Sequence, residues 1–89
     1  MSTHESHPDI IKRLKKSEGH IKSIIKMLES GRSCLDIAQQ LHAVEKAVNS
    51  AKKVLIHDHI DHCLNESISE NKISSELAVK EFKEITKYL

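Results

Sequence analysis

The chain has 89 residues and a formal net charge of +1, with two cysteines, one tyrosine, one phenylalanine and no tryptophan. This length suits one domain, 1–89, and a lone helical chain of this size buries so little surface that we expect an oligomer. No segment approaches the roughly 20 apolar residues of a membrane helix, and the N-terminus is polar rather than signal-like, so a membrane protein is excluded and a cytoplasmic location is predicted.

The first helix is expected at about 9–30, after a mobile tail at 1–8. Pro8 suits a first helical turn, and apolar residues from Ile10 to Leu28 recur at helical spacing. Ser30 and Gly31 end the pattern, since glycine readily takes the left-handed conformation that closes a helix. This helix carries six of the 14 lysine and arginine residues, namely Lys12, Arg13, Lys15, Lys16, Lys22 and Lys26.

The second helix is expected at about 34–64, with Ser33 as its N-cap and Asp36 three residues further on, as in a capping box. Its apolar stripe is too long for an ordinary globular helix and suggests pairing with another helix, as in a coiled coil. A third, short amphipathic helix is expected at about 74–88. The predicted class is therefore all-α, with three helices.

Cys34, His59 and Cys63 are the candidate metal ligands. Thiolates and imidazole suit Cu(I), Zn(II) or Ni(II), and His59 and Cys63 lie one helical turn apart. Cys34 falls in a first turn, where free amides and the helix dipole favour a thiolate. On one helix, Cys34 would lie roughly 43 Å from Cys63. We therefore expect antiparallel chains to share two equivalent sites, each with Cys34 from one chain and His59 and Cys63 from the other.

Each of these features also has a purely structural interpretation. A free cysteine on an apolar stripe is usually a core residue, but the spacing of His59 and Cys63 favours ligands. Of the remaining histidines, His4 and His7 are expected in the tail, and His20 and His42 at the surface or between helices. His57 and His62 are expected either to be exposed or to contact the metal ligands without binding the metal. The first 53 residues carry ten basic and six acidic residues. That excess fits either a solvated helix face or a surface that contacts phosphates.

The chain resembles the CsoR/RcnR family of bacterial metal-sensing repressors. The similarity covers nearly the whole chain. It rests on Arg13-Leu14 through Glu18-Gly19-His20, Met27-Leu28-Glu29, the run Gln40-Leu41-His42-Ala43-Val44, and Cys34, His59 and Cys63 at these separations.

The resemblance implies an antiparallel helical homodimer with a four-helix core, pairing into a disc-shaped homotetramer that binds double-stranded operator DNA and leaves it when the effector binds. Cys34, His59 and Cys63 match the Cu(I) ligands of the copper-sensing branch. Arg13 matches a position implicated in DNA binding, and the nearby Lys12, Lys15, Lys16 and Lys22 would join it. Copper sensors of the family also have a glutamate on the third helix that contacts the metal site without binding the metal. Glu81 is its best match here, two residues away from the position that the family pattern indicates.

Alternatives within and beyond the family stay open. Ser33 stands where copper sensors often carry tyrosine, and His4 or His7 could be the added N-terminal ligand of a Ni(II)- or Co(II)-responsive repressor. A persulfide or aldehyde sensor fits less well, because His59 and Cys63 are both present. A helical interaction module without metal would leave the ligand spacing a coincidence. An enzyme is not expected, because no third group would orient Cys34 and His59 as a nucleophile and base.

Overall fold

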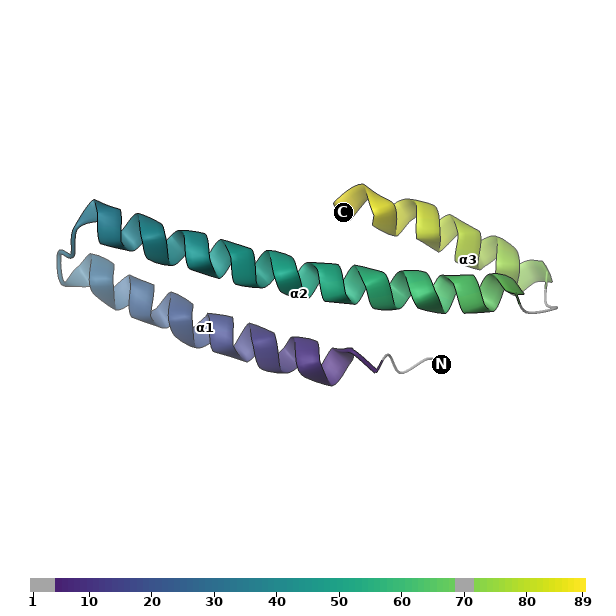
Figure 1. Cartoon of the computed structure of the whole chain (residues 1–89), viewed down its shortest axis with the longest axis horizontal. Coiled ribbons are helices and arrows are strands. Elements are labelled where there is room, and N and C mark those ends of the chain that lie inside the picture. The colour runs from purple at the N-terminus through teal and green to yellow at the C-terminus, as the bar shows by residue number, and fades with distance from the viewer. Residues whose placement is uncertain (1–4, 69–71) are drawn as a thin grey trace. The chain divides into compact units, whose positions relative to one another are not determined.

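The computed structural model describes residues 5–68 and 72–89, apart from the side chains of residues 63, 66–68 and 72–75. The regular elements of this part of the chain are three α-helices, α1 (His7–Glu29), α2 (Cys34–Ile68) and α3 (Lys72–Ile85), and a 3-10 turn, η1 (Thr86–Tyr88) (Figure 1). The expected all-α class is therefore confirmed. Among the described helices, none is both long and apolar enough to span a membrane.

The helix ends differ from the expected ones by a few residues. Helix α1 includes His7 and Pro8, which the sequence pattern places in the tail, and α2 continues four residues beyond the expected end at 64. Polar residues alone do not stop a helix, and the segment after Leu64 contains no proline or glycine. Helix α3 begins two residues earlier than expected, and its last turn tightens into η1.

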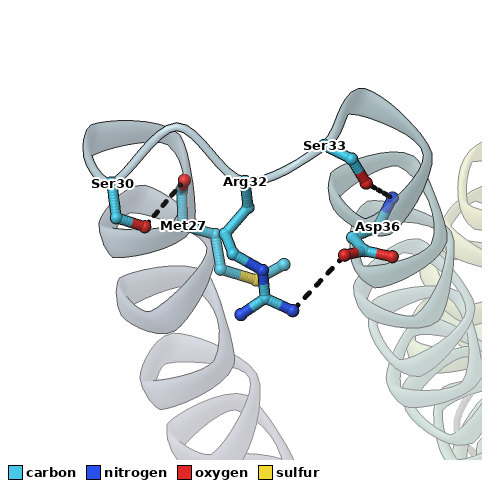
Figure 2. Close-up of polar contacts among 5 residues, drawn as sticks. All are labelled: Met27, Ser30, Arg32, Ser33 and Asp36. Atoms are coloured by element: carbon cyan, nitrogen blue, oxygen red, sulfur yellow. Dashed lines mark hydrogen bonds and ion pairs between the residues drawn. The ribbon is translucent and has the colours of Figure 1, made fainter.

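The connector between α1 and α2 begins with a Schellman motif. Gly31 has φ of 73°, the left-handed conformation predicted for it. The Arg32 amide donates to the Met27 carbonyl at 3.0 Å, and the Gly31 amide donates to the Leu28 carbonyl at 3.3 Å. Ser30 adds a hydrogen bond from its hydroxyl to the Met27 carbonyl at 3.2 Å (Figure 2). These bonds satisfy carbonyls that the end of α1 leaves without helical partners.

Ser33 caps α2, as predicted. Its Oγ accepts a hydrogen bond from the Asp36 amide at 3.1 Å (Figure 2). The Asp36 carboxylate pairs with Arg32 Nη2 at 3.4 Å, so an ion pair accompanies the serine cap. Cys34 is consequently held at the first position of α2 by contacts on both sides of it in sequence.

Ser33→Ala is expected to lower the free energy of unfolding by about 0.5–2 kcal/mol, because it removes the side-chain acceptor of an N-terminal amide of α2. Urea denaturation followed by circular dichroism measures the change. Ser30→Ala is the matched control, since the Ser30 hydroxyl contacts a carbonyl already served by the Arg32 amide. Equal stability of the two variants would contradict the capping role.

The chain divides into two compact units. The hairpin unit comprises residues 8–52, and the C-terminal unit comprises residues 53–89 with the N-terminal residues up to His7. In the hairpin unit, Ile24 of α1 packs with Ile37 and Val44 of α2, and the half-buried Met27 covers this cluster. In the C-terminal unit, Ile56 of α2 and Ala78 of α3 are buried. Isoleucine, valine and alanine build these cores, as the near absence of aromatic residues predicts.

Many large apolar side chains remain exposed on the single chain. They occur on all three helices and include Leu14, Ile21, Ile25, Leu28, Leu41, Val48, Leu55 and Leu77. So many exposed apolar side chains on one small chain are unusual for a monomer and typical of a surface that another chain covers. These residues are consistent with the expected oligomer.

Candidate functional site

Cys34 is an exposed free cysteine and the first residue of α2. Its position follows from the connector, because the Ser33 cap starts α2 at the next residue. A thiol at this point lies beside the N-terminal amides of the helix, which favour an anionic ligand. Cys34 is thus accessible to a metal ion or to a second chain.

His59 lies in the C-terminal unit and contacts α3. Its Nε2 is 3.3 Å from Oε2 of Glu81, and its side chain is 22% exposed, against 62% for Glu81. A carboxylate beside Nε2 favours the tautomer with a proton on that nitrogen, which puts the lone pair on Nδ1. Metal-binding histidines usually have such a carboxylate, carbonyl or water behind them. The pair therefore fits a histidine that binds a soft metal ion through Nδ1.

The third candidate ligand and the tail histidines are less fully described. Cys63 belongs to α2, one turn after His59, but its side chain lies outside the described residues. His4 also lies outside them, whereas His7 is the exposed first residue of α1. Within the C-terminal unit, the Ser6 hydroxyl donates a hydrogen bond to Oδ2 of Asp58. This contact, which the sequence gives no means of predicting, brings the N-terminal segment to the residue preceding His59.

A single chain does not assemble a complete metal site from the described side chains. No three His, Cys, Asp or Glu residues among them gather in a group that could hold a metal ion. Cys34 belongs to the hairpin unit, and His59 and Cys63 belong to the C-terminal unit. The predicted donor set of two thiolates and an imidazole fits the preferences of Cu(I), and the Glu81 carboxylate lies beside the imidazole of that set.

The basic residues of α1 lie mostly at the surface. Exposed side chains include the predicted DNA-binding residues Lys12, Arg13, Lys15, Lys16 and Lys22. Arg13 makes an ion pair with Asp9 through Nε at 2.8 Å, one turn earlier on the same helix. The pair is exposed, so it orients the guanidinium more than it stabilises the helix. The basic side chains of α1 are therefore exposed, and Arg13 is held by a carboxylate of its own helix.

The other histidines occupy the kinds of positions that were predicted. His20 lies between helices, with Nε2 2.6 Å from Oε1 of Gln40 on α2. His42 is exposed near Glu45, at 3.6 Å. His57 is exposed and His62 is partly buried. Unlike His20 and His42, His59 contacts a carboxylate on another helix.

Comparisons with known proteins agree with this geometry. Residues 6–89 match the sequence model of the family described as "Metal-sensitive transcriptional repressor". The chain is 36% identical over 62 residues to the copper-sensing transcriptional repressor CsoR of Mycobacterium ulcerans (strain Agy99), a match covering 70% of this chain and 53% of that protein. It is 39% identical over 82 residues to CsoR of Bacillus subtilis (strain 168), covering 88% of this chain and 79% of that protein.

The mycobacterial match spans about half the length of that relative. The nickel-responsive transcriptional regulator InrS has a similar solved structure. Its TM-score is 0.83 at 27% sequence identity, and the match covers 99% of this chain and 97% of that one. Copper and nickel regulators are thus both among the similar proteins.

Proposed function

We infer the function of this chain from the family to which it belongs, that of the metal-sensitive transcriptional repressors. We propose that it binds operator DNA in the cytoplasm when metal-free and releases the DNA when Cu(I) binds. The observation that carries the metal part is the 3.3 Å contact between His59 Nε2 and Glu81 Oε2. The partner carboxylate comes from another helix, and metal-binding imidazoles commonly have a group of this kind on the ring nitrogen that does not bind the metal.

We propose that two antiparallel chains share each metal site. Cys34 begins α2, and His59 and Cys63 lie near the other end of the same unbroken helix. A straight helix cannot bring its own ends together, but an antiparallel partner presents its start to the finish of the first chain. The exposed apolar residues along α2, such as Leu41, Val48 and Leu55, supply the contact surface for such a dimer. Two dimers would then form the tetramer.

The DNA part of the proposal rests on the basic surface of α1. Lys12, Lys15, Lys16 and Lys22 are exposed on one helix together with Arg13. A tetramer would repeat this helix four times and spread the charges over a surface wide enough to follow a duplex. Binding dominated by phosphate contacts weakens steeply as salt rises. With one tyrosine and one phenylalanine, the chain has few side chains for stacking on single-stranded bases, so duplex DNA is the better partner.

Metal and DNA are coupled through α2 in this proposal. A Cu(I) ion held by Cys34 of one chain and by His59 and Cys63 of its partner would supply a soft, three-coordinate link between the two helices. The link would fix the relative position of the two chains and so the spacing of the basic α1 helices. Metal binding changes the free energy of DNA binding by the coupling free energy between the two sites, typically about 1–3 kcal/mol.

A Ni(II)-responsive repressor is the second candidate, favoured by the hydrogen bond between Ser6 and Asp58. The bond holds Ser6 next to the residue that precedes His59, and His7, the first residue of α1, follows Ser6 directly. Added nitrogen ligands suit the square-planar preference of Ni(II).

An anaerobic titration of the reduced protein with Cu(I) and with Ni(II) separates the two metals. Thiolate charge-transfer absorption and binding to a DNA duplex are measured at each metal addition. The duplex is one that the metal-free chain has selected from a random-sequence library. We expect one Cu(I) per chain and loss of DNA binding at the same stoichiometry. Square-planar Ni(II) bands that disappear in His7→Ala would favour nickel. A chain that binds neither metal, or never binds DNA, would refute the repressor proposal.

Glu81→Gln is expected to weaken Cu(I) binding by about 10- to 100-fold, because the amide no longer holds the Nε2 proton of His59 as a carboxylate does. Competition with a Cu(I) chelator of known affinity measures the change. Glu84→Gln is the control, since Glu84 lies on the same helix but pairs with Lys87 at 3.0 Å. If the two variants bind Cu(I) equally well, Glu81 does not support the site.

A further inference from the structure

The hairpin unit contains a pocket between α1 and α2 that the metal site does not use. Its volume is about 230 Å³, and it is lined by Arg13, Lys16, Ser17, His20, Ala47 and Ser50. The first four of these residues come from α1 and the last two from α2. The small Ala47 and Ser50 leave the space that larger side chains would fill. The pocket is thus a feature of how these two helices pack within one unit.

The charged residues that line this pocket are all cationic. Arg13 and Lys16 are both exposed, and the residues that line the pocket include no Asp or Glu. Asp9 engages Arg13 only through Nε, at 2.8 Å, so the terminal amino groups of the guanidinium are not used in that contact. A guanidinium and an ammonium at one opening favour an anion with several oxygen atoms.

Polar hydrogen-bonding groups line the same space. Ser17 is only 6% exposed, the one polar residue buried among those described, and no hydrogen bond joins its hydroxyl to another described residue. No buried side-chain oxygen or nitrogen among the described residues lacks a hydrogen-bond partner, so the Ser17 oxygen is open to the pocket, where a ligand oxygen can accept its hydrogen. Ser50 faces the pocket from α2, and His20 is fixed at its wall by Gln40. Together these side chains form a polar surface behind the two cations.

We propose that this pocket binds one phosphate group, with Arg13 and Lys16 neutralising its charge and Ser17 and Ser50 donating hydrogen bonds to its oxygens. The phosphate is either free inorganic phosphate or a backbone phosphate of duplex DNA. Binding of a DNA backbone phosphate rests on the proposed function, whereas binding of inorganic phosphate depends only on the side chains that line the pocket. If the backbone is the source, the pocket fixes where α1 sits along a strand, which an exposed lysine cannot do alone.

The test has two arms with the full chain and matched variants. In the first, inorganic phosphate is added at constant ionic strength, with chloride as reference, and amide chemical shifts are followed. We expect saturable shifts around residues 13–20 and 47–50 that are lost in Ser17→Ala. Ser23→Ala is the control, because the exposed Ser23 hydroxyl bonds to the Gly19 carbonyl of its own helix and lies outside the pocket.

The second arm measures duplex binding across a salt series. Lys16→Ala is expected to lower the affinity by about tenfold and to reduce the slope of log affinity against log salt by about 1, relative to Lys26→Ala outside the pocket. Ser17→Ala should lower the affinity without changing that slope, because serine is uncharged.

The two arms together identify the source of the phosphate. Saturable phosphate shifts with unchanged duplex binding would assign the pocket to free phosphate, and weaker duplex binding would assign it to the DNA backbone. Shifts no different from those in chloride, with both variants binding duplex as their controls do, would overturn the proposal. A chain that retains DNA binding and metal release in that case would leave the repressor function standing. The phosphate arm remains decisive for the pocket even if no duplex is bound.

Discussion

Cys34→Ala is expected to abolish the effect of Cu(I) on DNA binding while leaving the affinity of the metal-free chain unchanged. In the unmodified protein, a coupling free energy of about 1–3 kcal/mol corresponds to a 5- to 150-fold loss of DNA affinity on metal binding. The variant lacks the ligand that connects the start of one α2 to the end of its partner, so the loss should disappear. Fluorescence anisotropy with a labelled duplex, with and without Cu(I) under anaerobic conditions, measures both affinities.

Cys63→Ala should behave in the same way, because it removes a ligand from the other chain of the same site. Ser30→Ala is the control in the connector near Cys34 and should retain the full response, since its hydroxyl contacts only the Met27 carbonyl. A Cys34→Ala chain that still releases DNA at stoichiometric Cu(I) would mean that Cys34 is not a ligand.

Ile24→Ala is expected to cost about 2–5 kcal/mol of the free energy of unfolding, a large fraction of the stability of a small domain. Ile24 is only 3% exposed and packs on Ile37 and Val44, which connect α1 to α2. Truncation leaves a cavity that the two helices cannot close without moving. Urea denaturation at fixed protein concentration gives the change.

The same truncation at Ile25, which is 49% exposed on the chain, serves as the control and should cost less. A loss at Ile24 no greater than that at Ile25 would contradict the assignment of the core to the Ile24 face of α1. Ile24→Ala should also weaken DNA binding. The core around Ile24 holds α1 against α2, the two helices that line the phosphate pocket, so partial unfolding of this core would disrupt the pocket.

Local signals were enough to predict the helices and the connector. Gly31 and Ser33 act through their own backbone and neighbouring amides, so their roles follow from residue type and spacing. The expected end of α2 at 64 is four residues too early, because the expectation rests on the polar residues that follow Leu64. Polar residues such as Asn65 lower helix propensity only slightly, so they do not fix where the helix ends.

Contacts between helices were much harder to predict. Glu81 was identified through a family resemblance with its position uncertain by two residues, and its distance from His59 depends on how α3 packs on α2. Sequence periodicity does not fix that packing. Nothing in the sequence distinguishes Ser17, because a serine on a basic helix is ordinary. Only its burial, opposite Ser50 on α2, makes it unusual.

The shared metal site is the central claim, and mixing two inactive variants tests it most directly. Cys34→Ala and Cys63→Ala chains are unfolded together in equal amounts, refolded, and titrated anaerobically with Cu(I). A mixed antiparallel dimer combines the intact Cys34 of one chain with the intact His59 and Cys63 of the other. Since half of the dimers are mixed and each regains one site, we predict recovery of about one Cu(I) per four chains. No recovery of Cu(I) binding in the mixture would contradict a site shared between chains, and so would full Cu(I) binding by either variant alone.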